Sequence, residues 1–284
     1  MPVVPIVLVA AALHASWNAL VKSVADRARL MAVMGGATAA LAVPLLLLAP
    51  LPHAEVWPAI GASVLLHLTY NLLLTASYRD GDYNQVYPIA RGTAPPVVAV
   101  CSVLLVGERL SGWQVAGLLV VSGGLVVLAA ARRHGSPRSV ALAVMTGLLI
   151  AAYTVLDGVG VRHAGTVAGY SGWLFVGQGL LTALALTAVG RRDPVRAAGG
   201  LTVSGLRTPA VARGVAAGAL SLAAYMLVLW AQTRGALAVV AALRETSVVF
   251  AGLIGAFALG ERLPSRRIGA SVLVAAGAVV LALG

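Results

Sequence analysis

The fold is decided by the stretch from Asn84 to Leu110, which reads NQVYPIARGTAPPVVAVCSVLLVGERL, because a diverged copy of it returns later in the chain. The copy, residues 237 to 263, reads LAVVAALRETSVVFAGLIGAFALGERL. One ungapped shift of 153 residues superposes GERL on GERL, Arg91 on Arg244 and Thr93 on Thr246. A match of this length, with an arginine inside an apolar run in both copies, predicts a duplicated unit.

Composition places the chain in a membrane. Of its 284 residues, 60% are hydrophobic and only 10% are charged, against about 25% charged in soluble domains, so polar residues are too few to coat a globule. The net charge of +11 comes from basic residues in short gaps between apolar runs, which predicts orientation in the membrane and not nucleic-acid binding. The expected partners are the lipid bilayer and a small solute, and a monomer would suffice.

Ten segments are apolar and long enough to cross a bilayer core of about 30 Å. Because the fourth segment is repeated as the ninth, each unit holds five helices, with expected boundaries at 1–134 and 135–284. Five is odd, so the second unit crosses in the opposite sense, which predicts an all-α fold of two inverted five-helix repeats, an architecture typical of secondary transporters. The predicted segments are Val3–Val21, Leu30–Ala49, Trp57–Ala76, Asn84–Val106, Trp113–Ala131, Ser139–Gly158, Val167–Val189, Pro209–Ala231, Leu237–Leu259 and Ile268–Leu283.

Lysines and arginines are distributed unevenly between the two sides of these ten crossings. One set of gaps holds 15 of them and the other set holds three, namely Arg109, Arg162 and Arg234. Cytoplasmic loops carry the excess of positive charge. The count therefore predicts that both termini lie outside the cell.

Polar side chains recur at helical spacing within several spans, where a helix surrounded by lipid would have few. They predict either a water-filled cavity lined by aromatic, amide and charged groups or polar contacts that bind helix to helix. In the first, third and fourth segments such side chains form a polar stripe along one helix face, and the three stripes together favour the cavity. The residues predicted to bind substrate are His14, Trp17, Asn18, His67, Tyr70, Asn71, Tyr78, Tyr87, Arg91, Tyr153, Asp157, Trp173, Tyr225, Arg244 and Glu245.

The duplicated arginines need partners, because an arginine at a helix centre costs about 2.5 to 3.5 kcal/mol on insertion scales. We expect Arg91 and Arg244 to be symmetry-related anchors beside a central site, or else to hold the bundle together. Glu245 is adjacent to Arg244 and points away from it, so it is predicted to pair with a cation on another helix. Pro95 and Pro96 predict a kink in the first copy, since they cannot donate helical hydrogen bonds.

The sequence contains no complete catalytic motif. Ser171, in Gly169-Tyr170-Ser171-Gly172, resembles the serine of rhomboid proteases, but every histidine precedes it. Asp80-Gly81-Asp82 reads as an ordinary turn, and no phosphate loop of the Gly-Lys-Ser/Thr type is present. We therefore expect no enzymatic activity and no metal site.

The ten spans, the duplication, YPIARGTAPP at residues 87–96 and the two GERL endings resemble the drug/metabolite transporter superfamily, in particular bacterial EamA-type permeases. The resemblance covers nearly the whole chain. It implies a multi-pass secondary transporter in the bacterial inner (plasma) membrane, without a cofactor, that moves small metabolites by alternating access around a central cavity. Amino-acid exporters, including those for aromatic amino acids, are a prominent branch. Drug, sugar and nucleoside or nucleotide-sugar carriers of the superfamily are alternatives, as is, outside it, a lipid-modifying membrane enzyme.

Overall fold

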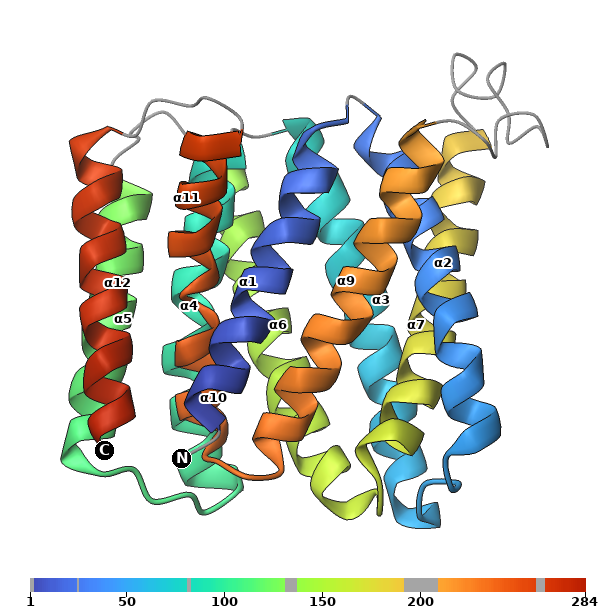
Figure 1. The fold of residues 1–284 in the computed structure, drawn as a ribbon, viewed down its shortest axis with the longest axis horizontal. Helices are drawn as coiled ribbons and strands as arrows, with labels where there is room; N and C mark the ends of the chain where they lie inside the picture. The colour runs from blue at the N-terminus through green and yellow to red at the C-terminus, as the bar shows by residue number, and fades with distance from the viewer. Residues whose placement is uncertain (1–2, 25, 81–82, 131–136, 192–208, 259–263) are drawn as a thin grey trace.

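The computed structural model describes residues 3–24, 26–80, 83–130, 137–191, 209–258 and 264–284. These ranges are helical, joined by short turns, and contain no β-strand. Ten of the helical stretches are long and apolar enough to cross a membrane. The predicted all-α integral membrane fold is confirmed (Figure 1).

The helices follow the apolar runs of the sequence closely. Two of them begin at a proline, Pro137 or Pro209, where the missing amide hydrogen costs nothing, and Asp26 caps another by accepting from the Arg29 amide at 3.1 Å. The helices are α1 (Val3–Lys22), α2 (Arg27–Leu48), η1 (Ala54–Val56), α3 (Trp57–Asp80), α4 (Tyr83–Leu105), α5 (Gly112–Ala130), α6 (Pro137–His163), α7 (Val167–Arg191), α9 (Pro209–Gln232), α10 (Leu237–Arg244), α11 (Ser247–Ala258) and α12 (Ser265–Leu283).

Corresponding helices of the two halves run in opposite directions. In Figure 1, α1, α3 and α5 run upward while their counterparts α6, α9 and α12 run downward, and α2 and α4 run downward while α7 and the α10–α11 pair run upward. The two ends of the described chain lie on the same face, which we call the terminal face. The halves are therefore inverted relative to one another. Their predicted boundary, between 134 and 135, falls outside the described residues.

The contacts between helices are related by the same symmetry: replacing each helix of a contact by its counterpart in the other half gives another contact that is present. The α2 helix packs on its own counterpart α7, and α5 packs on α12, while the α1–α9 contact is matched by α6–α3. Glycines allow the two contacts between a helix and its own counterpart: a Cβ at Gly35 would lie 2.8 Å from the Gly179 carbonyl oxygen, and a Cβ at Gly117 would lie 2.9 Å from that of Gly277. Such close backbone approach is how helices associate in lipid, where apolar burial alone does not drive them together.

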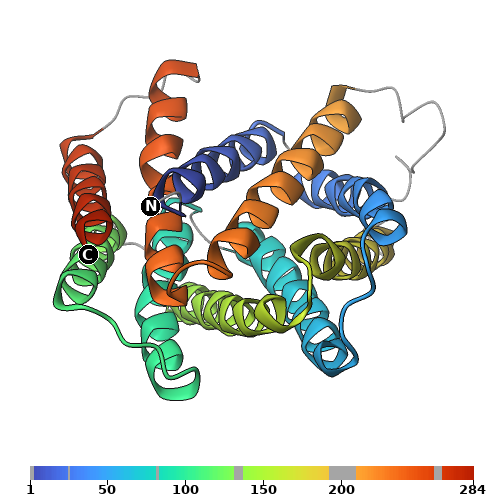
Figure 2. The same ribbon diagram turned by 60° about the horizontal axis from the view of Figure 1, so that its bottom comes forward.

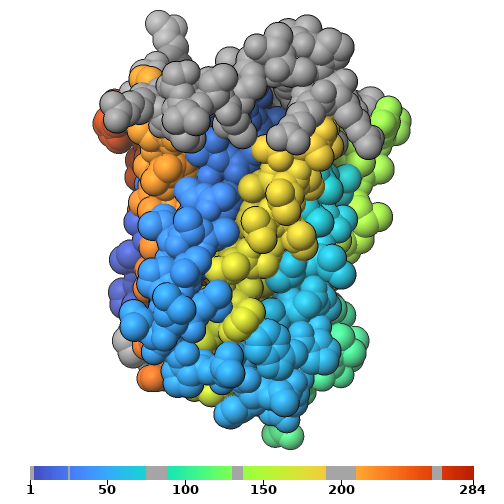
Figure 3. All heavy atoms as spheres, turned by 90° about the vertical axis from the view of Figure 1, so that its right-hand side faces the viewer, coloured from blue at the N-terminus to red at the C-terminus, as the bar shows by residue number. Residues whose placement is uncertain are grey.

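The α5–α12 pair stands at one side of the molecule, and α2, α3 and α7 lie at the other (Figure 2). On that other side α2, α7 and α3 form a continuous surface (Figure 3). Leu48, Leu65 and Leu184 are exposed on these three helices, as expected for a face in contact with lipid. Gly214 and Gly218 of α9 face α2, because a Cβ at Gly214 would lie 2.6 Å from the Val33 side chain and a Cβ at Gly218 would lie 3.0 Å from the Met34 carbonyl oxygen.

The interruption of regular helix lies in the second copy and not in the first. The α4 helix runs from Tyr83 to Leu105 with Pro95 and Pro96 inside it. Its copy is divided into α10 and α11 at Glu245 and Thr246, whose amides bond to the carbonyls three residues earlier at 3.1 Å. The sequence predicts a kink at Pro95 and Pro96, which a continuous helix can contain, but not the break at Glu245 and Thr246, which coincides with a buried charged pair described below.

Candidate functional site

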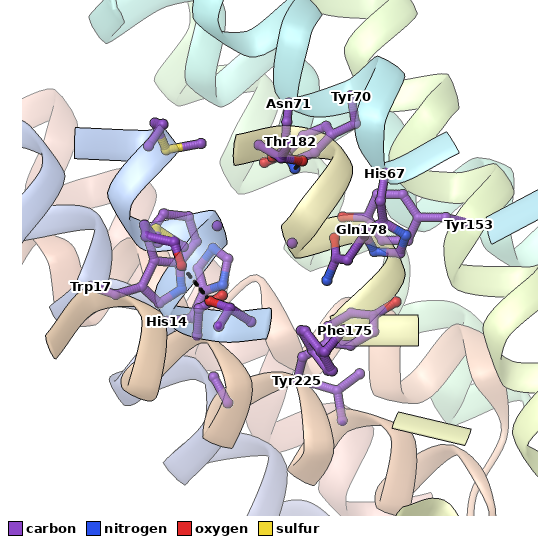
Figure 4. Close-up of a pocket in the computed structure, with 18 of the residues that line it drawn as sticks. His14, Trp17, His67, Tyr70, Asn71, Tyr153, Phe175, Gln178, Thr182 and Tyr225 are labelled. Atoms are coloured by element: carbon purple, nitrogen blue, oxygen red, sulfur yellow. Dashed lines mark hydrogen bonds between the residues drawn. The ribbon is translucent and has the colours of Figure 1, made fainter. Parts of the chain in front are cut away.

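A cavity of about 90 Å³, counted as the space open to the centre of a water molecule, lies among seven helices from both halves: α1, α2, α3, α6, α7, α9 and α10. Three of the four α2 residues on its wall, Met31, Met34 and Gly35, come from the first half of that helix, which begins at the face opposite the terminal face (Figure 1). Figure 4 shows side chains that line this cavity. The side chains that line it include His14, Trp17, Met31, Met34, Thr38, His67, Tyr70, Asn71, Tyr153, Phe175, Gln178, Thr182, Ser221, Tyr225 and Arg244.

Eight of the predicted binding residues line this cavity and five do not. Those on its wall are His14, Trp17, His67, Tyr70, Asn71, Tyr153, Tyr225 and Arg244. Asn18 is buried and donates to the His14 carbonyl of its own helix at 2.8 Å, and Trp173 packs edge-on against Trp57 at 4.8 Å between ring centres. Asp157, Arg91 and Glu245 lie behind the wall, as described below. The side chains of Tyr78 and Tyr87 lie outside the described part of the chain.

Aromatic rings form one wall of the cavity. His67 stacks on Tyr153 at 4.0 Å between ring centres, and Tyr225 meets His67 edge-on at 5.5 Å. Phe175 continues the wall, edge-on to Tyr225 at 5.7 Å (Figure 4). These side chains come from α3, α6, α7 and α9, so packing of the two halves against each other assembles the wall. The electron-rich faces of such rings attract apolar groups and cations alike.

Asp157 holds this wall from behind. Its side chain is fully buried and accepts hydrogen bonds from the hydroxyls of Tyr170 at 2.9 Å and Tyr225 at 2.5 Å. The His67 Nε2 atom lies 3.9 Å from its second oxygen. A buried carboxylate with two hydroxyl donors is a stable arrangement. Asp157 therefore orients the Tyr225 ring. Tyr153, four residues earlier on α6, lines the cavity itself.

Arg91 and Glu245 form a buried ion pair outside the cavity wall. Arg91 Nη1 lies 3.0 Å from Glu245 Oε1, and the two side chains are 5% and 1% exposed. A second Arg91 nitrogen contacts Nε2 of His14, which does line the cavity. The prediction that Glu245 pairs with a cation on another helix is confirmed. The helix break places this carboxylate beside α4.

Arg244 is in a different environment from its counterpart. It is 4% exposed and lines the cavity. Within the described part of the chain its Nε atom has no hydrogen-bond partner, and no carboxylate lies within ion-pair distance of its guanidinium. The two arginines of the duplicated stretch are thus not equivalent: one is neutralised in the bundle and the other faces the cavity.

Sequence reasoning missed the polar side chains that α7 contributes. Gln178 and Thr182 line the cavity, and Thr182 Oγ1 accepts from Asn71 Nδ2 at 3.1 Å. They lie four residues apart, on one face of a helix. That spacing was readable in the sequence. No group of three or more His, Cys, Asp or Glu side chains suited to a metal occurs among the described residues.

The first GERL joins two loops at the terminal face. Gly107, with φ of +75°, turns the chain out of α4 in a conformation that favours glycine. Glu108 then accepts from the Leu237 amide at 2.9 Å, at the N-terminus of α10, and from Arg162 at 2.8 Å. Acidic side chains are favoured at this end of a helix. The motif therefore ties the α4–α5 loop to the start of α10; the second GERL, at 260–263, lies outside the described residues.

Comparison with known proteins reveals a shared fold. No family model matches the chain, and no curated protein matches it. A solved structure, described only as a crystal structure of a protein, is similar with a TM-score of 0.78 over 99% of this chain and 97% of its own. At 19% sequence identity this similarity shows the fold alone.

Proposed function

We propose that this protein is a secondary transporter of the drug/metabolite type that carries amino acids, aromatic ones included, out of the cell. The observation that carries the proposal is the cavity between two oppositely oriented halves, with polar and aromatic side chains from both on its wall. Inverted halves around a midplane site are the arrangement from which alternating access follows. The resemblance of the duplicated stretch to EamA-type permeases supports the same assignment.

The chemistry of the wall favours an amphipathic solute. Trp17, Tyr70 and Phe175 offer apolar rings, whereas Asn71, Gln178 and Arg244 offer hydrogen-bond donors. Binding sites for small molecules combine these features, with a few polar groups fixing orientation. An amino acid with an apolar side chain presents both kinds of surface. The proposal assigns no chemical step to the protein, only movement of the solute.

Counterflow in proteoliposomes tests the proposal. Vesicles loaded with an unlabelled solute are diluted into the same labelled solute, using a panel of amino acids, sugars, nucleosides and cationic dyes. We expect transient accumulation of amino acids in vesicles that contain the protein and none in empty vesicles. Equal traces for protein-containing and empty vesicles across the panel would refute transport, and exchange of only the other classes would refute the amino-acid assignment.

A matched pair of variants on α9 links transport to the cavity. Ser221 lines it, whereas Ala219, two residues away, is exposed on the outer surface of the bundle. Ser221→Phe should fill the cavity and reduce exchange to the level of empty vesicles. Ala219→Phe adds the same ring outside the cavity and should leave exchange unchanged.

A further inference from the structure

The two arginines of the duplicated stretch have different electrostatic surroundings. Arg91 has a carboxylate partner at 3.0 Å, so its charge is neutralised within the bundle. Arg244 lies at the equivalent position of the inverted copy and faces the cavity. No hydrogen-bond acceptor bonds its Nε within the described residues. Both copies thus contain a buried arginine, and of these two only Arg91 has a carboxylate partner among the described residues.

A buried guanidinium without a direct partner is costly. Removing a charge from water is unfavourable unless an opposite charge and hydrogen bonds replace the lost hydration. His14, His67, Tyr153 and Tyr225 line the same cavity as Arg244, but none of them carries a fixed negative charge. Glu245, the next residue in the chain, bonds to Arg91 instead. Arg244 is therefore compensated in full only when an anion enters the cavity.

We propose that Arg244 binds the carboxylate of the transported solute, which makes the substrate class small organic acids with a single carboxylate, amino acids among them. The inference rests on the transport function proposed above and deepens it. A guanidinium presents paired N–H donors in a plane that matches the two oxygens of a carboxylate. One unpaired guanidinium balances one negative charge, which favours a carboxylate over a phosphate dianion.

The remainder of an amino acid has a place in the same cavity. An ammonium group is attracted to aromatic faces, and the wall of His67, Tyr153, Phe175 and Tyr225 supplies them. Asp157 lies behind that wall and is bonded to Tyr225, so its negative charge adds to the attraction of the wall for a cation. The cavity is thus polarised, with a cation on one helix and an aromatic wall backed by a carboxylate on others.

Binding of matched ligands to the purified protein in detergent tests the assignment. L-phenylalanine and L-phenylalaninamide differ only in the carboxylate, and 3-phenylpropionate lacks the amine. Phenyl phosphate and inorganic phosphate probe the phosphate alternative. We expect the wild type to bind the acid at least ten-fold more tightly than the amide, since a site built for a polar group rejects the analogue that lacks it, and to bind the phosphates more weakly than the acid.

Variants of Arg244 test whether this residue causes the preference for the acid over the amide. Arg244→Gln should remove the preference, so that the ratio of acid to amide affinity falls to about one, and Arg244→Lys, which keeps the charge without the fork, should retain part of it. Thr182→Val removes a cavity hydroxyl without changing charge and should weaken both ligands by similar factors. Thermal unfolding of each variant identifies those that fold. If Arg244→Gln does not fold, the ratio of acid to amide affinity is compared between the wild type and Arg244→Lys.

Four results would overturn the inference. They are an unchanged ratio in a folded Arg244→Gln protein, equal binding of acid and amide by the wild type, tighter binding of the phosphates, and counterflow confined to solutes without a carboxylate. In the last case transport itself stands and only the role of Arg244 fails. Absence of counterflow for every solute would instead refute the transport function.

Discussion

Arg91 Nη1 lies 3.0 Å from Glu245 Oε1, and this contact joins α4 to the break between α10 and α11. The pair connects the first copy of the duplicated stretch to the second. Both side chains are almost completely buried. Because the break in the second copy sets the carboxylate beside the first, the irregular backbone and the ion pair are best understood as one feature.

Loss of one member of this pair should destabilise the protein more than loss of both. Arg91→Met or Glu245→Met alone leaves a buried charge uncompensated, which costs about 3 to 5 kcal/mol. The double variant should unfold at a temperature closer to that of the wild type. Thermal unfolding in detergent measures all three, and a double variant less stable than either single one would contradict a role in neutralisation.

The two tyrosines bonded to Asp157 should differ in their effect on binding. Tyr170→Phe and Tyr225→Phe each remove one hydroxyl donor to the carboxylate, and a hydrogen bond to a charged group contributes about 1.5 to 3 kcal/mol. Both should lower stability. Only Tyr225 lines the cavity, so only its variant should also alter solute affinity, as measured by equilibrium binding. Equal changes in affinity would show that the two hydroxyls are equivalent for the solute.

Adjacent glycines on α2 should respond oppositely to alanine. A Cβ at Gly35 meets the Gly179 carbonyl oxygen at 2.8 Å, whereas a Cβ at Gly36 finds its nearest neighbour, in Ala183, at 3.9 Å. Gly35→Ala therefore forces α2 and α7 apart, and overpacking costs about 1 to 3 kcal/mol. Gly36→Ala should be neutral or slightly stabilising, because alanine favours helix. Melting temperatures in detergent compare the two; a Gly35 variant as stable as the wild type would argue against tight α2–α7 contact.

The orientation predicted from positive charge can be read with single cysteines. Ser23 and Ser111 are both exposed; Ser23 follows the end of α1 and Ser111 precedes the start of α5, and these two helix ends lie at opposite faces (Figure 1). In a Cys101→Ala background, a membrane-impermeant maleimide added to intact cells should label Ser111→Cys and spare Ser23→Cys. The reverse pattern would place both termini inside.

Glu108 should stabilise the terminal face through its two contacts. Glu108→Gln removes the charge that pairs with Arg162 and weakens the cap on the Leu237 amide. Because the Arg162 side chain is 27% exposed, solvent screens the pair, and we expect a loss of about 1 kcal/mol in the free energy of unfolding. Glu55 provides the control: it is exposed, it lies between the end of α2 and the start of α3 on the terminal face (Figure 1), and Glu55→Gln should have no effect. An equal loss of unfolding free energy in both variants would mean that the contacts of Glu108 do not contribute to stability.

Much of the site could be predicted because the polar residues recur at helical spacing. His67, Tyr70 and Asn71 share one face of α3 and do line the cavity, since a helix that must hide polar side chains from lipid turns them inward. Gln178 and Thr182 followed the same rule and were missed. Asn18 and Trp173 obey the spacing as well but bond or pack outside the cavity, since inward-facing polar groups serve helix contacts and cavities alike.

The sequence alone determined the ten helices, the duplication and the opposite orientation of the halves. These follow from local hydropathy, from the repeat and from an odd number of crossings, none of which depends on distant contacts. The tertiary structure decided which arginine is neutralised, where the ninth span breaks and which polar side chains share a cavity. Each of these depends on what another helix brings within about 3 to 4 Å, the range of hydrogen bonds and ion pairs, and a linear sequence does not contain that distance.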